Sequence, residues 1–179
     1  KEICTETYAD EIAQTDLTYL SDTTYIAIFQ NDINGNPYTL AHVVIQSPDQ
    51  ISTSVSKTRR LSIELYEDEN AILAMSSSML AGHAHFMDGL HITNAEIISD
   101  DQIPIGTELA CDTSGNLYKM QPDISTGNIA FTILADTPLL IQNSEPVQIP
   151  DAILQSKTCK SAVGMVKPCE YYFLTASDG

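Results

Sequence analysis

Apolar and polar residues alternate along most of this chain in short runs, and turn-forming residues separate the runs. The runs are rich in β-branched and aromatic residues, which favour pleated strands. The predicted strands are Thr23–Gln30, Tyr38–Gln46, Leu61–Tyr66, Leu90–Ile98, Thr107–Cys111, Leu117–Met120, Ile129–Leu134, Thr137–Gln142, Val147–Ile153, Ala162–Val166 and Glu170–Leu174. The sequence therefore predicts a mainly β fold.

Turn signals between these runs predict hairpins. Asn34-Gly35 is a strong two-residue hairpin signal, because both residues tolerate a positive φ. Gly115 and Asn116 supply the same freedom after Asp112, and Thr126-Gly127 marks a further turn. Neighbouring runs are therefore expected to pair as antiparallel strands.

One stretch, Ala71–Met87, has helical spacing. Its apolar residues Ala71, Ile72, Met75, Met79 and Leu80 recur at roughly helical intervals, although three serines interrupt them. We expect one short helix at most, near residues 71–81. The expected fold is a small barrel, a β-tulip-like domain or a sandwich.

Residues 1–22 differ from the rest, because they are acidic and their apolar residues are widely spaced. Ordering the backbone costs about 1–2 kcal/mol of conformational entropy per residue, and burial of so few apolar side chains does not offset this cost. We predict an N-terminal arm over residues 1–22 that orders against a partner protein, followed by one β-rich domain over residues 23–179. The partner-binding anchors would be Ile3, Tyr8, Ile12, Leu17 and Leu20. Deleting residues 1–20 should then leave the β-domain folded but abolish attachment to the assembly.

Length and charge narrow the classes of function. The 179 residues fit one domain with a substantial core. The 24 acidic residues outnumber the 8 basic ones, giving a net charge of −16. A chain this acidic repels phosphate backbones and anionic membranes, so we expect neither nucleic acid nor membrane as a partner. Three basic residues, Lys57, Arg59 and Arg60, lie in or beside an expected exposed loop over residues 47–60.

No run of apolar residues approaches the ~20 that a membrane-spanning helix needs. No signal peptide is expected, and Lys1 is compatible with processing or truncation. The four cysteines form no Cys-x-x-Cys pair. Cys159 and Cys169 would either form a disulfide in an oxidising compartment or remain free thiols.

A histidine-rich stretch offers the one pattern suggestive of an enzyme. His83 and His85 would share one face of a strand, and Asp88 and His91 follow. Cupins bind a metal with such a pair, but they need a later histidine, and none follows Pro104-Ile105-Gly106. His42 or a distant carboxylate would have to complete the site. We therefore expect no metal and no cofactor, and keep a cupin-like metal-dependent enzyme as an alternative.

Other chemistry is not supported. Asp32, Asn34 and Asn36 resemble the start of a calcium loop, but Pro37 and Val43 occupy the positions of its glycine and glutamate. Gly-x-Ser-x-Gly, a cysteine beside a histidine and phosphate-binding glycine loops are all absent. We expect a protein that is not an enzyme and that works through its shape and surface.

The segment Gly106–Asp136 carries a family resemblance. It reads GTELACDTSGNLYKM, a polar loop, then GNIAFTILAD. This order of strand, Asp with a Ser/Gly turn, return strand, polar loop and strand resembles the head decoration, or capsid cement, proteins of tailed bacteriophages.

The resemblance implies a β-rich domain, commonly trimeric, with an arm that orders on the capsid. Such a protein binds the major capsid protein on the outside of an icosahedral head and stabilises the shell against DNA pressure. The expected location is then the virion. An extracellular or cell-surface filament subunit remains a second hypothesis, distinguished by open helical assembly.

Overall fold

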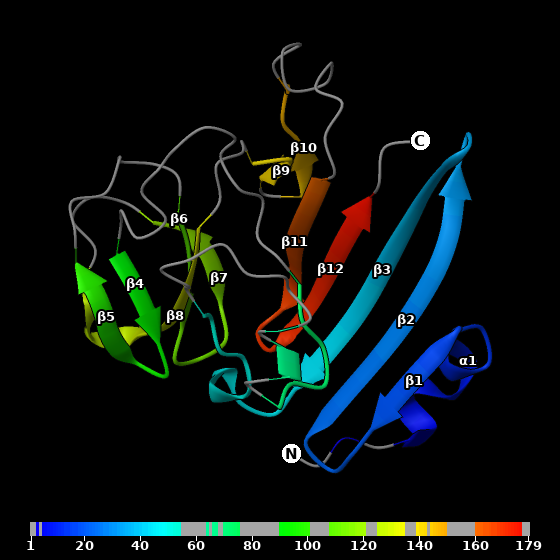
Figure 1. Cartoon of the computed structure of the whole chain (residues 1–179), viewed down its shortest axis with the longest axis horizontal. Coiled ribbons are helices and arrows are strands. Elements are labelled where there is room, and N and C mark those ends of the chain that lie inside the picture. The colour runs from blue at the N-terminus through cyan, green and yellow to red at the C-terminus, as the bar shows by residue number, and fades with distance from the viewer. Residues whose placement is uncertain are drawn as a thin grey trace.

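The computed structural model describes residues 3, 5–54, 64, 66–67, 70–75, 90–100, 108–120, 125–134, 139–142, 144–149 and 160–176 (Figure 1). Within these ranges the chain is mainly β, with several antiparallel sheets and little helix, which confirms the predicted fold class. No helix in the described ranges is long and apolar enough to cross a membrane.

The largest sheet has five antiparallel strands in the order β1-β2-β3-β12-β11. These strands are β1 (Leu17–Leu20), β2 (Thr24–Ile33), β3 (Asn36–Ile45), β12 (Glu170–Ala176) and β11 (Lys160–Lys167). The C-terminal strands thus pair with the N-terminal hairpin, which leaves β1 and β11 at the two edges (Figure 1). Four shorter elements at the start of the chain and in its loops are helical: η1 (Thr5–Tyr8), α1 (Ala9–Ile12), η2 (Pro48–Gln50) and η3 (Thr126–Asn128).

The remaining strands form three small antiparallel sheets. One has the order β7-β6-β8, built from β6 (Glu108–Asp112), β7 (Leu117–Lys119) and β8 (Ile129–Leu134). The other two are hairpins, of β4 (Leu90–Thr93) with β5 (Glu96–Asp100) and of β9 (Ile141–Gln142) with β10 (Glu145–Pro146).

The β2–β3 hairpin follows from its turn residues. Asn34 and Gly35 have φ values of 57° and 85°, as the predicted tight turn requires. The Gly35 N–H donates to Asp32 Oδ1 at 2.7 Å. This turn places Ile33 opposite Asn36. It thereby fixes the register of the whole hairpin, as far as the pair of Thr24 and Ile45.

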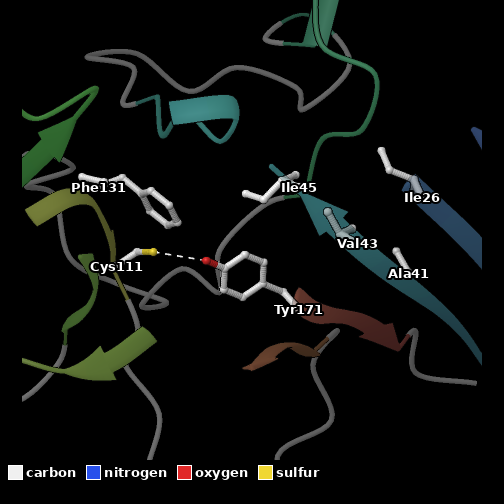
Figure 2. Close-up of a cluster of buried hydrophobic side chains, with 8 residues drawn as sticks. Ile26, Ala41, Val43, Ile45, Cys111, Phe131 and Tyr171 are labelled. Carbon is white, nitrogen blue, oxygen red and sulfur yellow. Dashed lines mark hydrogen bonds between the residues drawn. The ribbon is translucent and has the colours of Figure 1, made fainter. Parts of the chain in front are cut away.

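The main core lies between the five-stranded sheet and the β7-β6-β8 sheet (Figure 2). The large sheet contributes Ile26, Ala41, Val43, Ile45 and Tyr171, and the small sheet contributes Cys111, Ala130 and Phe131. Within the described strands this packing corresponds to the sandwich alternative. A second cluster, Ile92 with Ala110 and Ile129, attaches the β4–β5 hairpin to the far side of the small sheet.

Tyr171 and Gly115 join the two sheets. The Tyr171 hydroxyl donates to the Gly115 carbonyl at 2.8 Å and lies 3.3 Å from Cys111 Sγ (Figure 2). Gly115 has a φ of +87°, and the Cys169 N–H donates to the same carbonyl. The turn at 112–116 therefore rests directly on the turn between β11 and β12.

Asp112 organises the 112–116 turn. Its carboxylate accepts hydrogen bonds from the backbone of Ser114 and Asn116 and from the Asn116 side chain. Partial burial raises the pKa of Asp112, but these hydrogen bonds outweigh it and hold the pKa below its usual value. Asn116 therefore contributes through its side chain, whereas Gly115 alone supplies the positive φ.

Most predicted strands occur where expected, but some predictions were wrong. Residues 71–75 are not helical, whereas Ala9–Ile12, where no helix was predicted, form α1. The rest of the predicted helix lies outside the described residues. Glu64 and Tyr66 are helical where the strand Leu61–Tyr66 was expected, and residues 147–149 follow β10 without continuing as a strand.

The contact at Gly115 gives a first prediction. A Cβ at this position would lie 2.3 Å from Cys169 Sγ and 2.7 Å from the Cys169 nitrogen, in addition to the strain of a positive φ. We expect Gly115→Ala to lower the free energy of unfolding by about 2–4 kcal/mol. Gly35→Ala is the matched control, because Gly35 has a similar φ with nothing within 4 Å, and should cost about 1–2 kcal/mol. Urea unfolding measures both, and equal losses would contradict this account.

Candidate functional site

The predicted partner-binding residues lie mostly against the chain's own sheet. Ile3, Tyr8, Ile12 and Leu20 pack on Tyr25, Ala27 and Val44, on the face opposite the main core. Leu17 is 62% exposed. This differs from the arm expected over residues 1–22, because η1, α1 and β1 are part of the β-domain. Whether the segment also binds a partner stays a prediction.

The predicted metal ligands are not brought together in the described part of the chain. His83, His85 and Asp88 lie outside the described residues, and His91 is placed in β4 by its backbone alone. No group of three or more potential ligands occurs among the described side chains. Cys111 and Cys169 are free thiols there, and Cys159 lies outside the described residues.

A buried polar cluster lies beneath the N-terminal segment. His42, in the middle of β3, is 4% exposed. Its Nδ1 is 2.8 Å from Glu11 Oε1 on α1, and its Nε2 is 3.4 Å from Glu170 Oε1 on β12. Glu170 Oε2 is in turn 2.6 Å from Lys167 Nζ. Two carboxylates, an imidazole and an ammonium group are thus connected in one row.

The strand register places His42 at this point. Side chains alternate along β3, so Ala41 and Val43 face the main core while His42 and Val44 face the N-terminal segment. The residues directly opposite His42 are Ala27 and Tyr172. Ala27 is small and leaves room for the imidazole, and the Tyr172 ring stacks on it with ring centroids 4.6 Å apart.

Aromatic rings enclose the cluster. Tyr8 stacks on Tyr25 with centroids 4.2 Å apart, and both rings meet His42 edge-on. Burial raises the pKa of Tyr25, and the Glu11 carboxylate raises it further. Burial followed by the Glu170 charge raises the pKa of Tyr8. These phenols therefore remain neutral and act through packing.

The proton on His42 Nδ1 follows from its partner. An ionised carboxylate only accepts hydrogen bonds, so Nδ1 must carry the proton that reaches Glu11. This contact ties α1 to the centre of the sheet. The cluster thus holds the N-terminal segment against the sheet, and the same segment covers the cluster.

The second candidate feature is the open edge of the large sheet. Leu17 and Tyr19 on β1 pair with Ile28 and Ile26, so they extend the apolar face that forms the main core. Yet Leu17 and Tyr19 are 62% and 39% exposed. The main core therefore continues at this edge as an exposed apolar surface.

The charges around β1 have a single sign. No lysine or arginine occurs between Glu2 and Ser56, whereas Asp16 directly precedes β1 and Asp22 follows its end by two residues. Glu6 and Asp10 are exposed on the adjoining η1 and α1. We call β1 together with these four acidic residues the acidic edge. An apolar strip bordered by carboxylates is suited to a partner with apolar and basic groups.

Sequence reasoning missed the role of His42. It entered only as a substitute metal ligand, although a lone histidine within the apolar run Leu40–Ile45 was a signal for a buried, partnered imidazole. Leu17, one of the predicted anchors, is exposed, and its binding to a partner stays a prediction. Tyr19 was not among the predicted residues.

Comparison of the chain with known protein families and with curated proteins finds no match to either.

The His42–Glu11 contact gives a second prediction. Glu11→Ala would leave the buried imidazole without its carboxylate, so the free energy of unfolding should fall by about 1–3 kcal/mol. Asp10→Ala is the matched control, because it removes the neighbouring, exposed carboxylate from the same helix. Its effect should stay within about 0.5 kcal/mol. Thermal unfolding measures both, and similar midpoints for the two variants would overturn the proposed role of this contact.

Deletion of the N-terminal segment gives a third prediction, opposite to the one drawn from sequence. Removing residues 1–20 would expose Tyr25, Ala27, Val44 and His42, which are now 0–9% exposed. We therefore expect a lower unfolding midpoint and binding of a hydrophobic dye such as ANS. The comparison is Leu17→Ser with Tyr19→Ser, which changes only exposed side chains of the same segment. A truncated chain as stable as the full one would contradict this prediction.

Proposed function

We propose that this protein is a structural subunit that decorates the outside of a protein shell, and that it attaches through the acidic edge. The observation that carries the proposal is the exposure of Leu17 and Tyr19 on a face whose inner part is core. An apolar surface of this kind next to charged groups is typical of a docking site. The function as a capsid decoration protein rests on the resemblance of Gly106–Asp136 to that family.

Two features of the described chain support a role in assembly. First, β1 forms the edge of the large sheet that lies away from the three small sheets, so a partner can approach this edge from outside (Figure 1). Second, the buried polar cluster is enclosed by tyrosine rings and serves to hold α1 in place. Its groups are therefore committed to structure, and the surface is left to carry the function.

Binding to a shell tests the proposal. The full chain would be mixed with assembled shells of the major capsid protein encoded nearest to its gene, and the bound fraction measured by sedimentation. We expect saturable binding to the outside of the shell, seen as added density by electron microscopy. Open helical fibres of the chain alone would favour the filament hypothesis instead.

Substitutions at the acidic edge sharpen this test. Leu17→Ser with Tyr19→Ser should weaken shell binding at least about tenfold, because burying each apolar side chain contributes about 1.5–3 kcal/mol when complete. Ile97→Ser with Ile98→Ser is the matched control, since these β5 residues are 55% and 52% exposed on another sheet. Equal weakening by the two pairs would show that attachment does not depend on the acidic edge.

A further inference from the structure

Among the described residues, backbone groups on the open side of β1 have no backbone partner. In the hairpin that joins β1 to β2, the Ser21 N–H donates to the Thr24 carbonyl at 2.8 Å. In an antiparallel ladder, hydrogen-bonded residue pairs alternate with pairs that are not hydrogen-bonded. Starting from Ser21, the backbones of Tyr19 and Leu17 are therefore the next to form hydrogen bonds with β2. The N–H and C=O groups of Thr18 and Leu20 then point away from the sheet.

These outward groups have no other backbone partner within the described ranges. Every backbone hydrogen bond of β1 there goes to β2. The η1–α1 segment packs on the face of the sheet through Tyr8 and Ile12 and forms no ladder with β1. An edge strand with free donors and acceptors is a template on which an additional strand can pair.

The side chains around β1 determine which residues a strand paired with β1 should carry. A strand added beside β1 would place alternate side chains next to Leu17 and Tyr19, on the apolar face. Its ends would lie near Asp16 and Asp22, in a region without lysine or arginine. A partner strand with apolar residues at alternate positions and basic residues near its ends satisfies both conditions.

We infer that β1 accepts a basic, apolar β-strand of another protein by strand addition, extending the five-stranded sheet to six. This inference deepens the proposed function, on which it rests, by assigning the mode of attachment and the chemistry of the partner. A second copy of this chain fits less well, because pairing two β1 strands would bring the Asp16 and Asp22 carboxylates of both copies together.

Substitutions at Thr18 test the backbone contact. Thr18→Pro removes the outward N–H and blocks pairing, and edge strands tolerate proline where the N–H faces away from the sheet. Thr18→Val is the matched control, because it keeps the N–H while also losing the 2.7 Å contact between the Thr18 and Thr15 hydroxyls. Circular dichroism and thermal unfolding of the full-length variants show whether both keep the native fold.

Two binding measurements then follow. One is sedimentation with the shells described above. The other is fluorescence anisotropy with a short blocked peptide in which lysine alternates with valine. We expect Thr18→Pro to bind both at least tenfold more weakly than Thr18→Val. The same peptide with glutamate for lysine should bind at least tenfold more weakly to the unmodified chain, and raised salt should weaken binding of the lysine peptide.

Several outcomes would overturn the inference and separate it from the proposed function. Equal binding by the two Thr18 variants would reject strand addition while leaving shell attachment intact. Absence of shell binding by the unmodified chain would reject the proposed function itself. Dimerisation of the unmodified chain that Thr18→Pro abolishes would assign the edge to a second copy. If Thr18→Pro fails to fold, an N-methylated lysine peptide that binds as well as the unmethylated one gives the same rejection.

Discussion

The structure depends on the register of β2 against β3, because this pairing decides which side chains each face of the large sheet presents. Alternation along β3 sends Ala41, Val43 and Ile45 to the core shared with the small sheet, and His42 and Val44 to the N-terminal segment. A slip of one residue would place the imidazole among apolar side chains and turn Val43 to the carboxylates. The turn at Asn34-Gly35 prevents this slip by setting the pairing from its tip.

Burial of polar groups on one face accounts for the position of the N-terminal segment. An imidazole and a carboxylate removed from water without partners would cost several kcal/mol. Part of this cost is avoided, because Glu11 pairs with His42 Nδ1 and the Lys167 ammonium group lies 2.6 Å from Glu170 Oε2. The same segment covers Tyr25 and Ala27 with Tyr8 and Ile12. Polar and apolar requirements are therefore met by one short piece of chain, which explains why so sparse a pattern of apolar residues is enough to order it.

Local signals made much of the fold predictable. The bounds of β8 agree with prediction because Ile129–Leu134 is a continuous run of strand-forming residues, and the Asn34-Gly35 and Gly115 turns follow from positive φ values. The β4–β5 turn was missed because, of its two residues with positive φ, only Asn94 is a turn-forming type, whereas Ala95 is not.

Long-range pairing was harder to predict. The four residues of α1 are too few to show a helical period, and no sequence pattern reveals that the small side chain of Ala27 leaves room for His42. Four of the five residues predicted as partner anchors pack within the chain itself, and sequence alone does not distinguish packing within the chain from packing against a partner.

Because the Cys111 thiol contacts Tyr171 across the interface between the two sheets, its reactivity reports on that interface. Cys111 is fully buried, and burial raises the pKa of its thiol to about 11. A thiol that is both inaccessible and protonated reacts with alkylating reagents only when the sheets separate. The rate of its modification at neutral pH therefore measures how often this interface opens, without any label being introduced into the protein.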